Sequence, residues 1–133
     1  MAKAKISKQL SFALANRVGL LSKISTALAD AKVNINAICA YAMGKKAYFM
    51  LITDKNAQAK KALSKLKRNF EEEDVVSVEM PNRAGELQKI AKKIADAEID
   101  IIYMYGTAAG AGKFSICVFK TIDDKKAVRV INK

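Results

Sequence analysis

The sequence lacks histidine and tryptophan altogether, and it has one proline and two cysteines among its 133 residues. Without histidine there can be no Ser-His or Cys-His catalytic pair and no imidazole ligand for a metal. Cys39 and Cys117 stand singly in apolar runs, so their spacing indicates neither a disulfide framework nor a zinc site. We therefore predict a protein that is not an enzyme, has no catalytic or metal-binding residues and no cofactor, and lies in the reducing cytoplasm.

Long apolar runs are also missing. No segment approaches the roughly 18 apolar residues that a membrane helix requires, and the first apolar run, residues 10–15, is too short for the core of a secretory signal. Hydrophobic residues nevertheless make up 51% of the chain, which is enough to bury a core. These features predict a globular protein that does not interact with membranes.

Acidic residues are scarce in the first half of the chain. Residues 1–69 hold 14 basic and 2 acidic side chains, whereas residues 70–133 hold 10 and 11, so the net charge of +11 comes from the first half. Such an asymmetry fits either a solvated lysine surface or a polyanionic partner. The aromatic residues of the expected third strands lack the motif of RNA-recognition domains. We therefore expect that nucleic acid is not the partner.

One stretch of sequence occurs twice, 66 residues apart. The turn 16–21 (Asn-Arg-Val-Gly-Leu-Leu) returns as 82–87 (Asn-Arg-Ala-Gly-Glu-Leu), and segments 16–35 and 82–101 agree at ten of twenty positions. A strand pattern precedes each copy and a helix pattern follows it. The amides that begin a helix have no intrahelical acceptor and favour an anion. Alternatively, Asn16 and Asn82 only cap their helices and the glycines only permit the turn.

The two copies predict two similar modules, at residues 1–72 and 73–133. In each copy the hydrophobic periodicity indicates strand, helix, strand, strand and helix. The first copy should end with a strand and the second should begin with one, but the sequence between them has a single strand pattern, residues 75–80. The fourth strand of each module is then borrowed, shared or absent. The order predicts an α+β protein of two ferredoxin-like βαββ(αβ) modules, with antiparallel sheets and helices on one face.

A second shared pattern ends each first helix, at residues 29–35 and 95–101: Ala-Asp-Ala, any residue, Val or Ile, Asn or Asp, and Ile. Together with the Asn-x-x-Gly-x-Leu turns, it resembles ACT domains, which are small βαββαβ modules that bind amino acids. The resemblance covers nearly the whole chain and implies a tandem ACT protein. The family usually has proline before the turn glycine, where this chain has Val18 and Ala84.

The resemblance implies an amino acid bound between two modules, with its carboxylate on the loop amides and its ammonium on the loop and the second strand. Carried over by motif, the site residues are Asn16, Arg17, Val18, Gly19, Leu20, Leu21, Asn34 and Asn36 in the first copy, and Asn82, Arg83, Ala84, Gly85, Glu86, Leu87 and Asp100 in the second. The copies differ, because Glu86 replaces Leu20 and would repel a ligand carboxylate or compete for its donors. We therefore predict that the first loop is the binding loop.

These inferences predict an amino-acid-binding regulatory or sensor protein, a homodimer in which a free amino acid shifts the population between two packings. Two alternatives stay open. A regulatory subunit of an amino-acid biosynthetic enzyme would co-purify with a large catalytic partner. An RNA-binding ferredoxin-like protein would bind nucleic acid in a salt-dependent manner and would not be stabilised by amino acids.

Overall fold

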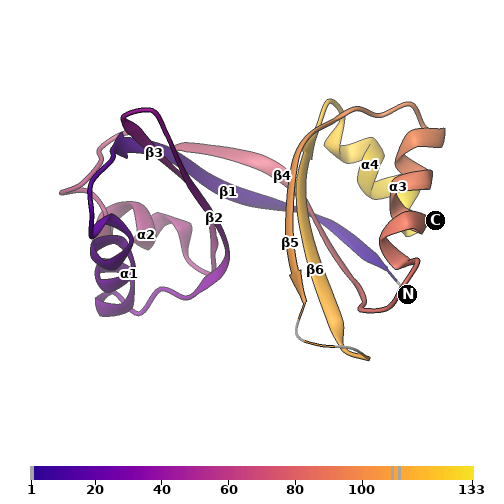
Figure 1. The fold of residues 1–133 in the computed structure, drawn as a ribbon, viewed down its shortest axis with the longest axis horizontal. Helices are drawn as coiled ribbons and strands as arrows, with labels where there is room; N and C mark the ends of the chain where they lie inside the picture. The colour runs from indigo at the N-terminus through magenta and orange to yellow at the C-terminus, as the bar shows by residue number, and fades with distance from the viewer. Residues whose placement is uncertain (1, 109, 111) are drawn as a thin grey trace. The chain divides into compact units, whose positions relative to one another are not determined.

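The computed structural model describes residues 2–108, 110 and 112–133 (Figure 1). Its elements in chain order are β1 (Lys3–Ala15), α1 (Leu20–Asp30), β2 (Ile35–Met43), β3 (Lys46–Thr53), α2 (Asn56–Ala62), β4 (Glu71–Pro81), α3 (Glu86–Asp96), β5 (Ile101–Ala108), β6 (Phe114–Thr121) and α4 (Asp124–Asn132). Antiparallel strands and helices in this order confirm the predicted α+β, ferredoxin-like class. No helix in the described part of the chain is both long and apolar enough to cross a lipid bilayer.

The chain divides into two compact units. We call Lys8–Glu73 the N-terminal module, and Met1–Ser7 with Asp74–Lys133 the C-terminal module. Strand β4 passes from one unit to the other, and it includes the single strand pattern, residues 75–80, that the sequence analysis placed between the two copies. Strand β1 does so too, which places residues 1–7 in the C-terminal module and not within the expected 1–72. A continuous strand pattern in the sequence does not show at which residue the strand passes from one module to the other. Its periodicity shows only which side chains lie on the same face.

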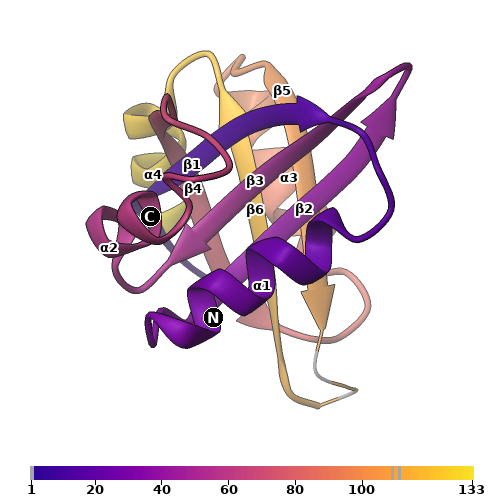
Figure 2. The ribbon, with the colours of Figure 1, turned by 90° about the vertical axis from the view of Figure 1, so that its left-hand side faces the viewer.

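The N-terminal module has its strands in the order β2-β3-β1, all antiparallel. Helices α1 and α2 lie on one face of this sheet (Figures 1 and 2). In the register of β1 and β3, Leu10 faces Leu51 and Phe12 faces Phe49, and all four side chains are buried. Apolar residues at every second strand position therefore meet the buried stripe of α1, which includes Ile24 and Leu28, in one core.

The C-terminal module has the order β4-β6-β5, with Lys3–Ser7 of β1 at the outer side of β4. Helices α3 and α4 share one face of this sheet (Figure 1). Ala4 belongs to the core, and its backbone exchanges two hydrogen bonds with the side chain of Asn132 in α4, at 2.8 and 2.9 Å. Ser77 Oγ donates to Ser7 Oγ at 2.8 Å. Specific contacts thus hold the first strand segment to this module.

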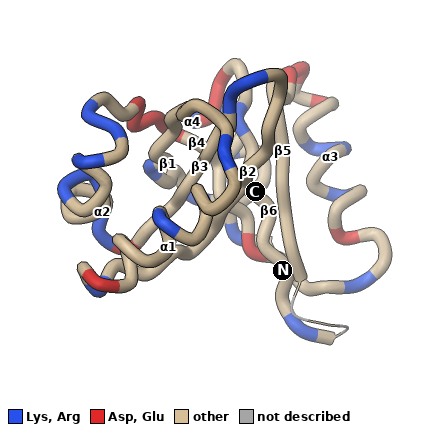
Figure 3. The backbone as a smooth tube through the Cα atoms, turned by 60° about the vertical axis from the view of Figure 1, so that its left-hand side comes forward, with Lys and Arg blue, Asp and Glu red and all other residues tan. Residues whose placement is uncertain are grey.

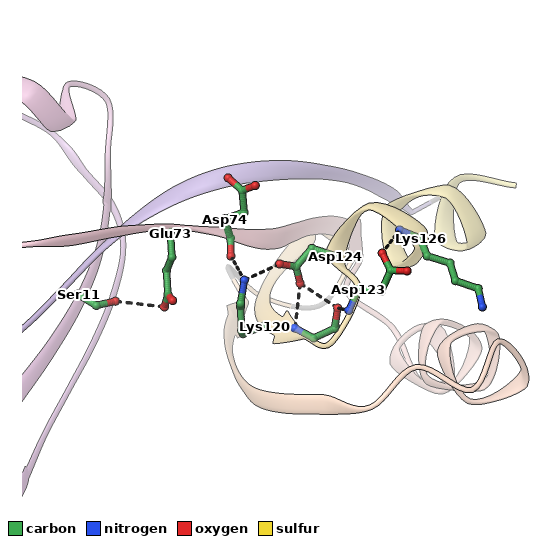
Figure 4. A network of polar contacts seen from close by, with 8 residues as sticks. Ser11, Glu73, Asp74, Lys120, Asp123, Asp124 and Lys126 are labelled. Atoms are coloured by element: carbon green, nitrogen blue, oxygen red, sulfur yellow. Dashed lines mark hydrogen bonds and ion pairs between the residues drawn. The ribbon is translucent and has the colours of Figure 1, made fainter.

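The beginning of α4 is fixed to β6 by polar groups (Figure 4). The side chain of Asp123 accepts a hydrogen bond from the Lys126 amide at 3.1 Å and so caps the helix. The carboxylate of Asp124 accepts from the Thr121 amide at 2.9 Å, from the Thr121 hydroxyl at 2.8 Å and from Lys120 Nζ at 2.7 Å. Because its partners lie at the end of β6, Asp124 sets the position of α4 against the sheet.

Candidate functional site: the two repeated loops

Both repeated turns have the same backbone conformation. Gly19 and Gly85 have φ angles of 94° and 92°, in the left-handed region that glycine adopts without steric cost, and each directly precedes its helix. Among the described residues no side chain caps α1 or α3, so the alternative in which Asn16 and Asn82 are helix caps is wrong. The two glycines permit the turn, and the start of each helix is left without a side-chain acceptor.

Each asparagine is instead tied to a neighbouring strand hairpin. The Asn16 amide donates to the Lys45 carbonyl at 2.8 Å, and the Asn82 amide donates to the Lys113 carbonyl at 2.5 Å. Each loop is therefore held at the end of its sheet where the second and third strands of the module meet. These are backbone contacts, so the asparagine side chains were not needed to form them.

The amides at the start of α1 are unused. The first intrahelical bond runs from the Lys23 amide to the Gly19 carbonyl at 3.0 Å. Within the described part of the chain, no group accepts a hydrogen bond from the amides of residues 20–22. These donors lie at the positive end of the helix dipole, so this end of α1 favours an anion. Leu20 is buried in the core, whereas Val18 and Leu21 are exposed and leave the loop open to solvent.

The loop before α3 uses one of the corresponding amides internally. The Glu86 amide donates to the Arg83 carbonyl at 3.3 Å, a bond that the first loop lacks in its described residues. The Glu86 carboxylate accepts from Arg83 Nε and from Lys89 Nζ, both at 3.1 Å. Glu86 is only 8% exposed although it is charged, because these two cations cover it. The second loop thus carries its own anion.

The first loop keeps the two cations without this carboxylate. Arg17 and Lys23 stand at the repeat positions of Arg83 and Lys89, and no ion pair in the described residues involves them. In the second loop, hydrogen bonds from Arg83 and then Lys89 lower the pKa of Glu86 below its usual value of 4.5. The charge around the first loop is therefore positive and uncompensated, whereas the charge around the second is partly neutralised.

We expect Glu86→Gln to remove part of the pH dependence of stability. Because the pKa of Glu86 is lowered in the folded state, its ion pairs stabilise the protein above the unfolded pKa, and this contribution is lost as the pH falls through the folded pKa. The variant should therefore be less stable than the wild type at pH 7 and equal to it near pH 2, by urea denaturation of the C-terminal module.

The exposed pair Lys92–Asp96 gives a matched control, since Asp96→Asn removes an i,i+4 ion pair whose partners are both more than half exposed. Asp96→Asn should leave the difference in stability between pH 7 and pH 2 unchanged. An equal effect of the two substitutions would show that Glu86 is no more than another surface charge.

The second-strand candidates of the N-terminal module lie far from its loop. Asn34 Nδ2 donates to Asn36 Oδ1 at 2.8 Å, and the Asn34 amide donates to Asp54 Oδ1 at 2.9 Å. Both asparagines are exposed at the beginning of β2, next to the end of β3, whereas the loop lies beside Lys45 at the other end. The two ends of β3 are seven residues apart, which is about 23 Å at about 3.3 Å per residue. One module therefore does not bring Asn34 or Asn36 to its own loop.

The C-terminal module repeats this separation. The Asp100 carbonyl accepts from the Ile122 amide at 3.2 Å, beyond the end of β6, whereas Asn82 lies at the hairpin before β6. Four of the predicted residues, Asn82, Arg83, Glu86 and Leu87, instead line a hollow of about 480 Å³. The residues carried over by motif do not include the other polar residues of its wall, Tyr105, Thr107 and Ser115. Tyr105 belongs to a group of tyrosines at the end of a second strand, which is more often sheet packing than a pocket. Thr107 and Ser115 are ordinary strand residues, so no sequence signal indicated them.

Comparison with known families identifies the module that holds the first loop. Residues 8–71 match the model of the ACT domain, which is nearly the extent of the N-terminal module. These residues are similar to an ACT domain. No curated protein matches the sequence. The family model does not extend over residues 72–133, where the repeated turn and the shared element order indicate a second module of similar architecture.

Solved structures resemble the whole chain. The protein BT0572 from Bacteroides thetaiotaomicron is 27% identical with a TM-score of 0.86, and the alignment covers 97% of this chain and 88% of that one. The aspartokinase α and β subunits give a TM-score of 0.63 at 16% identity, over 98% and 95% of the two chains. The regulatory subunit of aspartate kinase from Thermus thermophilus gives 0.64 at 14% identity, over 97% and 94%. At these identities the last two show a common fold.

Proposed function

We propose that the protein is an amino-acid-binding regulatory protein of two ACT modules, and that residues 16–21 bind the ligand carboxylate. The unused amides of residues 20–22 carry this proposal, since they are fixed donors at the positive end of α1. Arg17 and Lys23 add positive charge, and no carboxylate of the described residues forms an ion pair with either of them. In the second loop, Glu86 competes for the place of a ligand carboxylate.

The ammonium group requires acceptors, and Asn34, Asn36 and Asp100 offer side-chain oxygens. Because each lies at the opposite end of its own module from the loop, we propose that a small amino acid binds at a module interface, with its two charged groups on different modules. The second module can belong to this chain or to the second copy in a homodimer. Either arrangement makes ligand binding depend on how the modules pack.

In this function the protein catalyses no reaction of its own. A ligand that binds one packing of the modules better than another shifts their population, by no more than its difference in affinity. The occupancy is then passed on to a partner in the cytoplasm. The common fold with aspartate kinase regulatory subunits favours an enzyme of amino-acid metabolism as this partner. In that case the protein is a regulatory subunit of a biosynthetic enzyme.

A thermal-shift screen of the twenty amino acids at 1 to 10 mM tests the proposal. One amino acid or a few related ones should raise the melting temperature, because a ligand at 100 times its Kd stabilises the folded state by about 2.7 kcal/mol. The N-acetyl and amide derivatives of the same amino acid, which lack one charge each, should have no effect. A screen in which no amino acid raises the melting temperature at 10 mM contradicts the proposal.

A further inference from the structure

A hollow of about 530 Å³ lies on the N-terminal module, and none of residues 16–21 lines it. Its volume is in the range of small-molecule sites. Strand residues from β1, β2 and β3 form one part of the wall, and the segment that leads into β4 forms the other. The residues that line it are Ser11, Phe12, Ala13, Tyr41, Tyr48, Phe49, Met50, Lys67, Asn69, Phe70, Glu71 and Glu73. All belong to one module.

The strand register places two tyrosines on the sheet face that is turned away from the core. Tyr48 lies opposite Ala13 on one side and opposite Tyr41 on the other. Its sequence neighbours Ala47 and Phe49 point into the core, so Tyr48 points away from it. The rings of Tyr41 and Tyr48 stack with their centroids 5.2 Å apart at an interplanar angle of 20°. They present a flat aromatic surface to the hollow.

Two carboxylates belong to the opposite part of the wall. Ser11 Oγ donates to Glu73 Oε1 at 3.5 Å, so Glu73 lies on the same face as Ser11 (Figure 4). Glu71 is two residues earlier in β4 and shares this face. Between the tyrosines and the carboxylates, β1 carries only the small side chains of Ser11 and Ala13. These leave the space that the hollow occupies.

The charge of the hollow is opposite to that of its module. Residues 8–73 hold 12 basic and 5 acidic side chains, a net charge of +7. The wall holds two carboxylates and one cation, Lys67. Many of the other basic positions lie in α2 and the residues after it (Figure 3), and among these Lys60, Lys61, Lys65 and Arg68 do not line the hollow. Glu72, between the two wall carboxylates, turns to the other side and pairs with Lys60.

We propose that this hollow is a second ligand site, for a small organic cation such as an alkyl- or arylammonium ion. The apolar body of the ligand lies against the tyrosine pair, whose rings offer an apolar aromatic surface. Its ammonium group meets Glu71 and Glu73, which accept hydrogen bonds from it. This site does not depend on the amino-acid loop, because the two share no residue.

The test uses 2-phenylethylammonium as the probe on the full chain, followed by amide NMR shifts. Binding with a millimolar Kd should shift residues of β1 and β3 around Ala13 and Tyr48 and leave residues 16–21 unchanged. The neutral analogue 2-phenylethanol has the same ring without the charge, and it should bind at least tenfold more weakly. Equal binding of the two probes, or shifts confined to residues 16–21, would overturn the proposal.

Substitutions separate the two halves of the site. The double variant Glu71→Gln, Glu73→Gln should bind the ammonium probe at least tenfold more weakly. The variant Tyr48→Leu should bind both probes more weakly. Glu72→Gln is the matched control, because it removes a neighbouring carboxylate that does not line the hollow, and it should leave the affinity unchanged. Unchanged binding in the folded Glu71→Gln, Glu73→Gln variant, or no binding of the probe at 20 mM to the wild type, rules the site out.

Discussion

A protein that carries Leu20→Glu is expected to lose amino-acid binding, whereas one that carries Glu86→Leu is expected to keep it. The first substitution gives the N-terminal loop the residue that the C-terminal loop has at the same repeat position. Arg17 and Lys23 then stand three residues before and after the new carboxylate, as Arg83 and Lys89 do around Glu86. The new carboxylate therefore competes with the ligand carboxylate for these two cations.

The expected loss of affinity is about 10-fold to 100-fold, which corresponds to about 1.4 to 2.7 kcal/mol for a charged contact that is blocked. Isothermal titration with the most stabilising amino acid of the thermal screen measures it. Because Leu20 is buried, Leu20→Met serves as the packing control and should bind normally. If Leu20→Glu binds normally and Glu86→Leu changes the affinity, the ligand carboxylate belongs to the second loop.

Deletion of residues 2–7 is expected to destabilise the C-terminal module and to leave the N-terminal module folded. The deletion removes the strand segment beside β4, the core side chain of Ala4 and the two bonds between Ala4 and Asn132. At about 1 kcal/mol for each hydrogen bond, the loss of these bonds and of part of the strand pairing amounts to about 3 kcal/mol. Hydrogen exchange resolves the effect for each module, because it reports local stability.

The faster exchange should be confined to β4, β5, β6 and their helices. Asn132→Ala is the matched point substitution, because it removes the side-chain partner of Ala4 but keeps the strand. It should reproduce about 1 to 2 kcal/mol of the loss. Faster exchange mainly in β2 and β3 would instead show that residues 2–7 stabilise the N-terminal module.

Much of the fold could be predicted because local signals agreed with one another. The spacing of Leu20, Ile24 and Leu28 predicted a helix with one apolar stripe, and all three side chains are buried. The repeated Gly19 and Gly85 predicted the same turn twice, and their φ angles differ by only 2°. These features depend on contacts within about ten residues of chain, which periodicity and turn preferences describe well.

The arrangement of the candidate site was harder to predict from the sequence. Asn34 and Asn36 follow the first helix closely in sequence, yet they lie at the far end of the sheet from the loop. The reason is geometric, since α1 runs from the loop toward that end and β2 starts there. Likewise, the burial of Glu86 depends on where Arg83 and Lys89 place their side chains. A motif gives the residues of a site but not the distances between them.

By itself, the sequence determined the element order, the duplication and the difference between Leu20 and Glu86, because residue types and local periodicity carry this information. Only the tertiary structure decided that residues 1–7 belong with the C-terminal module and that Tyr41, Tyr48 and Glu73 line one hollow. The physical reason is that strand pairing joins residues far apart in the chain. The alternation of residues along a strand shows which face of the sheet each side chain points to. It does not show which other strand pairs with that strand.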